Sequence, residues 1–567
     1  MIRRALAPLL LLLATAAPAA GQQARWWSPV VADTAMVASA KAEATQVGLD
    51  VIRRGGNAVD AAVAVHFALA VTLPYAGNIG GGGFMIVRRP DGVVHAYDYR
   101  ERAPLAAAAD MYLDEEGEVI EGASWFGWQA VATPASVAGM ALVHERHGTV
   151  PWSELVAPAI RYAEEGFAVD PYTHRAIASK EEAIRRYPAA AAILLPGGDV
   201  PAVGDTLKQP QLARTLRSIA EGGAEPFYEG AIADSIVAAM RRHGGLITHE
   251  DLRSYEAKER RPVTFDYRGR TIHSMGPPSS GGLTLMWILE QLETWEMAEV
   301  PFHSAASVHR IVEAMRRAYA ERNALLGDPD HVDLPAELWT EAYGRALALT
   351  IDPSRATPSA EVRPELYEMR IPEESPETTH FSIVGPDGTA VSSTTTINGW
   401  FGSLATVAGI FLNNEMNDLT VKPGVPNAYG LVQGEANAIE PGKRPLSAMT
   451  PTIVEEDGAI RYLVGTPGGS TIITTVAQIL IHAIDYGMTF AEAIDARRFH
   501  HQHLPDEIAV EPFGLSVDTV EILRRLGHAF RFRDGYSGRA EGIEIGREDG
   551  RLYGRSDLRG GGTADGY

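Results

Sequence analysis

The chain has 567 residues, no cysteine and a formal net charge of −22 at pH 7. The absence of cysteine excludes disulfides, thiol catalysis and thiolate metal sites. The net negative charge argues against nucleic acid and anionic membrane surfaces as partners, because both are themselves negatively charged. The length allows a large core without covalent cross-links and, by itself, three or four domains at roughly 150 residues each.

The N-terminus has the layout of a secretory signal peptide. Arg3 and Arg4 precede a leucine run at 9–13, and small residues follow as far as Gly21. The apolar run is too short for a membrane span, which needs about 20 residues. We therefore expect residues 1–20 to be removed and the protein to be exported, periplasmic or secreted, without a membrane anchor. An N-terminus that anchors the chain is the alternative.

Two helices are expected in the first part of the chain. Residues 58–71 are almost wholly apolar and alanine-rich, which indicates a buried helix. A glycine run at 77–83 follows and leads into a strand at 84–87; no Lys-Ser/Thr pair follows it, so it is not a P-loop. Residues 304–326 carry apolar side chains at helical spacing. In that amphipathic helix the residues expected to face outward are Glu313, Arg316, Arg317 and Glu321.

The second part of the chain begins with a polar, proline-rich stretch from about 352 to 377, the strongest linker candidate. Four strands are expected after it, at 380–384, 389–397, 452–455 and 461–464. A helix is expected at about 471–485. Strands and helices thus occur in separate runs as well as mixed. This favours an α+β layered fold over a strict parallel α/β alternation.

Thr378 stands where the linker meets the first of these strands. If the bond from Glu377 is cut, Thr378 gains a free α-amino group beside its own hydroxyl, which places nucleophile and base in one residue. Thr396 lies one hairpin away and could hydrogen-bond this hydroxyl. Most threonines at a strand edge are only strand formers, so the pattern alone gives a hypothesis.

Two polar segments could complete such a site. Gly468 and Gly469 precede the last expected helix and can present successive N–H groups, as an oxyanion hole requires; a plain tight turn is the alternative. Residues 413–418 carry amide and carboxylate groups that could hold an amine, unless they form a solvated loop.

Other polar clusters are less informative. Arg100 and Arg102 could clamp a carboxylate through two parallel hydrogen bonds or make surface ion pairs. No Gly-x-Ser-x-Gly motif supports an ordinary serine hydrolase. The spacing of His500, His501 and His503 fits no metal-ligand motif, so a structural histidine cluster is favoured and no metal is expected.

Taken together, the motifs closely resemble those of the γ-glutamyltransferases (γ-glutamyltranspeptidases), self-processing members of the N-terminal nucleophile hydrolases. The resemblance covers nearly the whole mature chain. Its motifs, in chain order, lie at 55–62, 76–78, 98–101, 277–282, 327–329, 378–380, 443–447, 465–470 and 498–502.

The resemblance implies an α+β fold, a four-layer αββα sandwich. It implies self-cleavage between Glu377 and Thr378, which gives a large subunit (21–377) and a small catalytic subunit (378–567) within one αββα unit. Thr378 would attack the γ-carbonyl of a γ-glutamyl compound such as glutathione, with its own amine as base. Water, an amino acid or a dipeptide would accept the acyl group. No cofactor is implied.

The resemblance also implies roles for the residues around Thr378. Thr396 would assist the hydroxyl, and the N–H groups of Gly468 and Gly469 would stabilise the oxyanion. The α-carboxylate would be bound by Arg100 and Ser447, and the α-ammonium by Asn398, Glu415 and Asp418. Tyr429 would belong to a possible lid at 423–434.

One departure and two alternatives remain. Many members carry two adjacent serines where this chain has Ser447 and Ala448, so weaker donor binding is expected. A glutaryl-cephalosporin (β-lactam side-chain) acylase is one alternative, but Asp418 argues against it because a glutaryl group has no ammonium. The other is a non-catalytic periplasmic peptide-binding protein, against which Thr378 and Thr396 argue.

Overall fold

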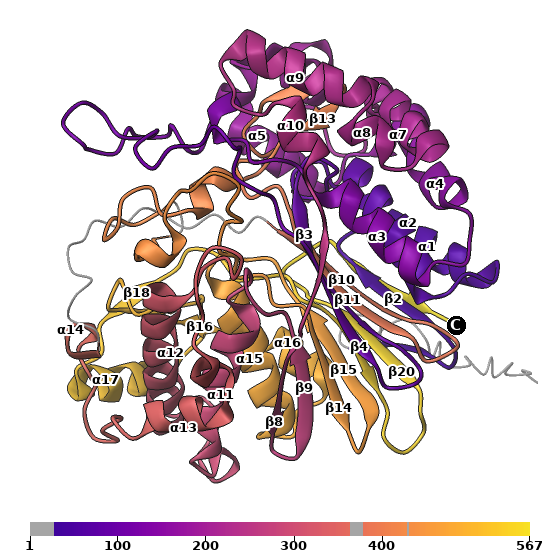
Figure 1. The fold of residues 1–567 in the computed structure, drawn as a ribbon. Coiled ribbons are helices and arrows are strands. Elements are labelled where there is room, and N and C mark those ends of the chain that lie inside the picture. Colours follow the sequence, from indigo (N-terminus) through magenta and orange to yellow (C-terminus); the bar gives the residue numbers. More distant parts are fainter. Residues whose placement is uncertain (1–27, 363–377, 428–429) are drawn as a thin grey trace, which may run out of the picture.

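The computed structural model describes residues 28–362, 378–427 and 430–567. The expected signal peptide, most of the expected linker, Glu377 and Tyr429 lie outside the described residues. Two seven-stranded antiparallel sheets face each other, and helices cover their outer faces (Figure 1). The expected α+β fold with αββα layers is confirmed.

The strand that follows Thr378 lies near the middle of one sheet, which we call the Thr378 sheet. In spatial order its strands are β21 (Thr563–Gly566), β2 (Met36–Ser39), β10 (Thr379–Val384), β11 (Ala390–Thr396), β3 (Gly82–Arg88), β4 (Val94–Tyr99) and β7 (Lys258–Arg260). The opposing sheet has the order β1 (Val30–Ala32), β20 (Leu552–Ser556), β19 (Glu541–Ile545), β15 (Ala459–Gly465), β14 (Thr452–Glu456), β9 (Arg270–Ser274) and β8 (Val263–Tyr267).

Strand β3 shows how both faces of the Thr378 sheet become buried. Successive side chains of a strand point to opposite faces. Phe84 and Ile86 lie in the core between the sheets, whereas Met85 and Val87 lie in the core under the helices. Because both faces of the sheet are buried, the sequences of its central strands consist of continuous apolar or small residues and do not alternate between apolar and polar.

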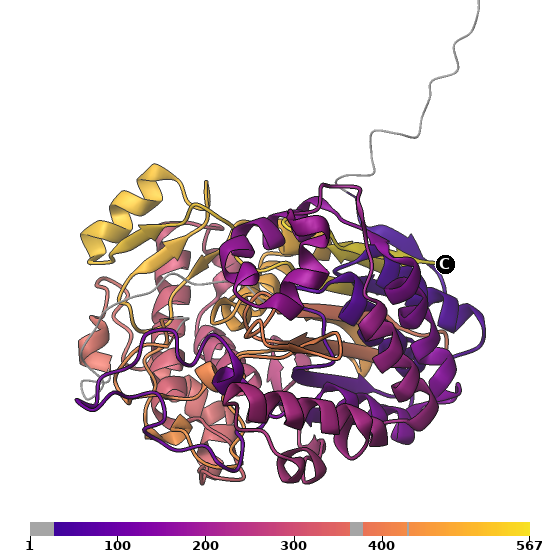
Figure 2. The same cartoon turned by 90° about the horizontal axis from the view of Figure 1, so that it is seen from above.

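Helices from the first half of the chain cover the Thr378 sheet. The expected apolar helix is α2 (Ala58–Thr72); every residue in it is buried, and Asn57 caps its first turn. It packs with α1 (Ala42–Arg53) and α3 (Ser136–His147) on the sheet, and further helices lie outside them (Figure 2). These are α4 (Trp152–Glu165), α5 (Pro171–Arg185), α6 (Pro188–Leu194), α7 (Pro210–Gly222), α8 (Glu225–Tyr228), α9 (Ala231–His243) and α10 (His249–Arg253).

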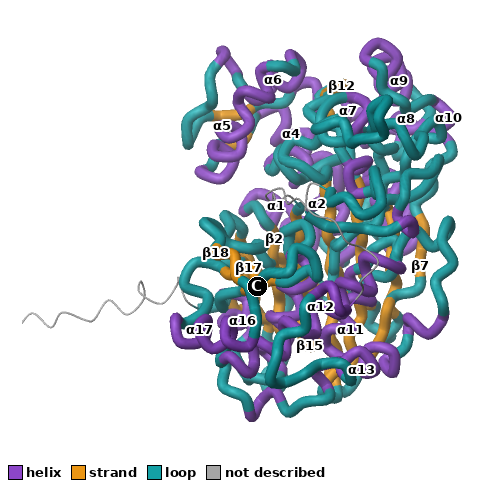
Figure 3. The backbone as a smooth tube through the Cα atoms, turned by 90° about the vertical axis from the view of Figure 1, so that its left-hand side faces the viewer, coloured by secondary structure: helices purple, strands orange, loops and turns teal. Residues whose placement is uncertain are grey.

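Helices from the second half of the chain, with those between β9 and β10, cover the opposing sheet, so the helices gather at the two ends of the molecule (Figure 3). They are α11 (Gly281–Glu293), α12 (Ala305–Leu325), α13 (Glu341–Ala348), α14 (Ser359–Val362), α15 (Thr471–Ile484), α16 (Phe490–Asp495) and α17 (Val517–Leu526). A small sheet of β16 (Phe499–His500), β17 (Ile508–Val510) and β18 (Phe530–Phe532) lies beside them. Within the described residues, every helix is too short or too polar to cross a membrane.

Helix α12 corrects one expectation. Its bounds match the sequence pattern, but the four charged residues expected to face outward (Glu313, Arg316, Arg317 and Glu321) are buried. Other segments cover that face: Arg316 pairs with Asp506, and Arg317 donates to the carbonyl oxygen of Thr350 over 2.7 Å. Periodicity reports the polarity of a helix face; it does not report which later segment packs on it. Once covered, charges must be paired, as they are here.

Candidate active site

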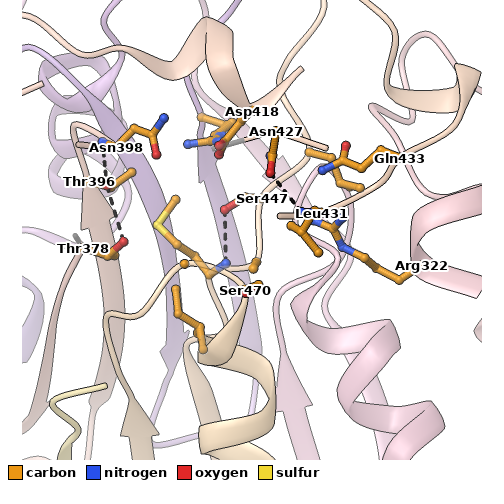
Figure 4. Close-up of a pocket in the computed structure, with 16 residues that line it drawn as sticks. Arg322, Thr378, Thr396, Asn398, Asp418, Asn427, Leu431, Gln433, Ser447 and Ser470 are labelled. Atoms are coloured by element: carbon orange, nitrogen blue, oxygen red, sulfur yellow. Dashed lines mark hydrogen bonds and ion pairs between the residues drawn. The ribbon is translucent and has the colours of Figure 1, made fainter. Parts of the chain in front are cut away.

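Thr378 and Thr396 lie side by side at one end of the β10–β11 hairpin. Thr379 pairs with Thr395 in the antiparallel register, so Thr378 and Thr396 form the next opposed pair. The Thr378 hydroxyl donates to Thr396 Oγ1 over 3.5 Å, and Thr396 Oγ1 accepts the N–H of Asn398 at 2.8 Å (Figure 4). The hydroxyl contact expected across the hairpin is therefore present.

The glycine turn before α15 faces the same cavity. Gly468 has φ 144° and Gly469 has φ 54°, conformations that other residues rarely adopt. Gly469 lines the cavity together with Thr378, whereas Gly468 does not. Among the described residues, neither backbone N–H donates a hydrogen bond. Free N–H groups at a helix start suit the stabilisation of an oxyanion.

The other end of the cavity is charged. Arg100 follows β4, is fully buried and lies 2.7 Å from Glu415, 2.5 Å from Asp418 and 3.3 Å from Glu101. Burial raises the pKa of Glu101 and of Glu415 above the usual range, although the Arg100 guanidinium opposes both shifts. Asp418 lines the cavity, and its Oδ1 has no hydrogen-bond partner in the described part of the chain. Glu415 does not line it; it contacts the Arg100 side chain from within the protein.

The segment 413–418 is thus a buried part of the site. Glu415–Asp418 forms the short helix η6, and Asn413 anchors the segment by donating to the carbonyl oxygens of Gly80 and Ala132. The solvated loop held open as an alternative is wrong, because these side chains satisfy backbone groups of neighbouring segments.

Ser447 and Asn398 complete the expected set. Ser447 Oγ accepts the N–H of Met449 at 3.1 Å (Figure 4), so its own proton is available to a ligand. Asn398 Nδ2 donates to the Asn414 carbonyl at 3.0 Å, and its side chain lines the cavity. Ala448 also lines the cavity and offers no donor there.

Sequence reasoning missed several wall residues, and Arg322 is the most polar of them. Asn427, Leu431 and Gln433 belong to the possible lid at 423–434, and the remaining lining residues are Leu446, Met449, Ser470 and Ile472. A signal for Arg322 existed: it falls three residues after Tyr319 and four before Leu326, on the apolar stripe of α12. An arginine on a face that should be buried indicates a specific partner or a cavity.

Two further clusters do not join the cavity. Arg102 donates to Ser254 Oγ over 2.6 Å instead. The His500 imidazole hydrogen-bonds Thr474, and that of His503 hydrogen-bonds the carbonyl oxygen of Ser359. His501 faces Asp506 at 3.4 Å. Each imidazole therefore has a different protein partner, as a structural histidine cluster requires.

A different group of candidate metal ligands lies together elsewhere: His309, Glu313 and His528, all buried. Glu313 already pairs with Arg316 and Arg317, and the two imidazoles contact each other at 2.8 Å. Two guanidinium groups beside the only carboxylate make this group a poor cation site.

Comparisons with known proteins agree over nearly the whole chain. The family model described as gamma-glutamyltranspeptidase matches residues 44–567. The glutathione hydrolase proenzyme of Escherichia coli is 47% identical over 535 residues, which cover 94% of this chain and 91% of that protein.

Two solved structures extend the comparison. A cephalosporin acylase from Bacillus halodurans superposes with a TM-score of 0.83 at 26% identity, over 98% of this chain and 99% of that one. The γ-glutamyltranspeptidase of Helicobacter pylori superposes with a TM-score of 0.57 at 40% identity, over 59% of this chain and 97% of that one.

Proposed function

The chain belongs to the γ-glutamyltranspeptidase family and is an enzyme of that family; on this premise we propose that Thr378 carries its chemistry. Self-cleavage between Glu377 and Thr378 would give a large subunit of residues 21–377 and a small subunit of residues 378–567. The observation that carries this proposal is the contact between the Thr378 and Thr396 hydroxyls, on a cavity wall shared with Gly469.

The proposed reaction begins after cleavage, when the Thr378 nitrogen is a free amine. Thr378 Oγ1 attacks the γ-carbonyl carbon while the α-amine takes the hydroxyl proton. Thr396 fixes the attacking oxygen, and the N–H groups of Gly468 and Gly469 stabilise the oxyanion of the tetrahedral intermediate. The leaving amine takes up the proton and departs. Water or an acceptor amine then attacks the γ-glutamyl ester and regenerates Thr378.

The charged end of the cavity supports recognition of a γ-glutamyl group. Asp418 Oδ1, which has no partner within the described residues, suits an α-ammonium; Asn398 lines the same cavity, and Glu415 contacts Arg100. Arg100 and Ser447 are candidate donors to the α-carboxylate. We propose glutathione and related γ-glutamyl compounds as donors, with water, amino acids or dipeptides as acceptors.

The cephalosporin acylase alternative is the weaker one. The relative named for glutathione hydrolysis is 47% identical to this chain, against 26% for the acylase structure. A glutaryl group would also offer no ammonium to Asp418 Oδ1, the oxygen that Arg100 leaves without a partner within the described residues. Export to the periplasm or the medium stays a prediction from the N-terminal pattern.

The proposed nucleophile is tested by comparing Thr378→Ala with Thr379→Ala. The Thr379 hydroxyl is buried and has no hydrogen-bond partner within the described residues, so its removal should disturb little. With L-γ-glutamyl-p-nitroanilide, Thr378→Ala should lose activity by at least about 10³-fold and stay uncut. Thr379→Ala should be cut and active. Normal cleavage or activity of Thr378→Ala contradicts the assignment.

A further inference from the structure

A second cavity, which we call the outer cavity, adjoins the cavity that Thr378 lines, which we call the substrate cavity. The outer cavity has a volume of about 410 Å³, within the range of about 300–1,000 Å³ that is typical of small-molecule sites. Residues from 119–126 and from 417–427 form its walls, and Lys180 of α5 joins them. Thr378 does not line it, so a molecule bound there does not contact the proposed nucleophile.

Exposed apolar side chains gather at the outer cavity. Val119, Ile120, Phe126 and Val425 are 36–46% exposed, and all four line it. Apolar surface in contact with water is unfavourable, and where several such side chains meet they mark a contact site. An occupant with an aromatic or apolar body would remove these side chains from water.

The charged side chains of the outer cavity favour an anion. Lys180 makes no hydrogen bond or ion pair within the described residues, and the two carboxylates that follow it on α5 pair with nearby arginines. Lys422 also lines the cavity and pairs with Glu118. Among the described lining residues the two lysines meet a single carboxyl group, that of the exposed Glu121. Lys180 is therefore available to a carboxylate.

One wall separates the two cavities. Asn427, Leu431 and Gln433 line both, and Figure 4 shows them on the side of the substrate cavity away from Thr378. Their segments pair with each other: the Asn427 N–H donates to the Leu431 carbonyl oxygen over 3.1 Å, and the Gly424 N–H donates to that of Gln433 over 3.3 Å. A molecule in the outer cavity would restrict this wall, and a donor that binds to the restricted wall loses less conformational entropy.

We propose that the outer cavity binds a small molecule with an aromatic or apolar body and one carboxylate, which Lys180 holds. We further propose that this occupant strengthens donor binding through Asn427, Leu431 and Gln433. The coupling is reciprocal, so the donor strengthens binding of the occupant equally. Binding in the outer cavity is independent of the proposed function; only the effect on the donor rests on it.

The probe for binding is indole-3-propionate, and its neutral amide is the matched control ligand. Isothermal titration calorimetry of the purified wild-type protein should give a Kd on the order of 0.1–1 mM for the carboxylate. The amide should bind about tenfold more weakly. Lys180→Gln should weaken binding of the carboxylate about tenfold. Lys208→Gln, which replaces an exposed lysine outside the cavity, should leave it unchanged.

Steady-state kinetics with L-γ-glutamyl-p-nitroanilide test the coupling. Indole-3-propionate at a concentration that saturates the wild type should lower KM about fivefold, with kcat little changed. Lys208→Gln should respond in the same way and Lys180→Gln far less. An unchanged KM would contradict the coupling, and a raised KM would place the probe in the substrate cavity and contradict the proposal. If the protein turned over no donor, the proposed function would fail while the binding result still stood.

Equal affinity for the carboxylate and the amide, or equal affinity of Lys180→Gln and the wild type, would overturn the proposal. Ile120→Glu keeps the test decisive if Lys180→Gln does not fold, since Ile120 lies outside α5 and is 46% exposed. The added carboxylate should abolish binding of the probe, and normal binding by this variant counts against the proposal. A wild-type dimer that Ile120→Glu dissociates, with no probe bound, would assign the surface to a second copy of the chain instead.

Discussion

The two ends of the cavity are built from different chemistry. At the end where the reaction would occur, Thr378, Thr396 and Gly469 offer neutral hydroxyl and N–H groups, fixed by a strand pair and a helix start. Cleavage would add the α-amine of Thr378. At the other end, Arg100 and Asp418 are charged, and burial perturbs the carboxyl groups packed around them.

This difference assigns separate tasks to the two ends. Neutral donors on rigid elements can stabilise a charge that develops during the reaction without attracting a charge beforehand. Buried charges attract a zwitterionic substrate but contribute equally to its ground state and transition state. Changes at the charged end should therefore act mainly on KM, and changes at the neutral end mainly on kcat.

The largest effect on KM is expected from Asp418→Ala. Removing the carboxylate deprives the substrate ammonium of its partner and leaves the Arg100 charge without the Asp418 carboxylate that offsets it. KM for a γ-glutamyl anilide should therefore rise about 100-fold. A glutaryl anilide, which has no ammonium, is the matched control and should change far less. Equal changes for the two anilides would remove Asp418 from ammonium binding.

A smaller effect is expected from Thr396→Val. The variant keeps the side-chain volume but loses the oxygen that accepts from Asn398 and contacts the Thr378 hydroxyl. We expect kcat to fall about 10-fold, near the upper value of one hydrogen bond between neutral groups, with KM nearly constant. Thr396→Ser restores the oxygen and should recover most of kcat. A rise in KM alone, measured by steady-state kinetics, would contradict the separation of tasks.

The smallest effect concerns His380, two residues after Thr378. Burial lowers its pKa from 6.5 to about 3, so the folded protein keeps it neutral. The unfolded chain binds more protons between these values, and stability falls as the pH drops from 6.5 toward 3. At pH 5.5 this group costs about 1.4 kcal/mol.

His380→Gln lacks this titration, so its melting temperature should fall less between pH 7 and pH 5.5 than that of the wild type. Because the imidazole also hydrogen-bonds Thr394 and Ser382, the variant is expected to be less stable at pH 7. The comparison therefore uses the change with pH within each protein. Equal changes in the two proteins would show that His380 is not kept neutral by the fold.

The sequence predicted those parts of the fold that follow from local pattern. The buried helix at 58–71, the two strands after Thr378 and the glycine turn before α15 all lie where expected, because apolar periodicity and turn residues act over a few neighbours. The expected hairpin placed Thr396 near Thr378, and the register observed in the structure sets the two residues opposite each other.

Long-range packing was not accessible in this way. Glu313 and Arg317 appeared solvent-facing because the segment around Thr350, which covers them, is distant in the sequence. Likewise nothing local showed that Glu415 would lie against Arg100, more than 300 residues earlier, or that Arg322 would reach the cavity. These placements depend on how the two sheets and their helices pack against one another, and the periodicity of the sequence does not predict that packing.

The most direct test of the central assignment is the N-terminal sequence of the smaller piece after the purified protein has matured. The account predicts a piece of 190 residues (567 − 377) whose first residue is Thr378, with the remainder of the chain as the larger piece. An intact single chain after prolonged incubation, or a small piece that begins at any other residue, would contradict it.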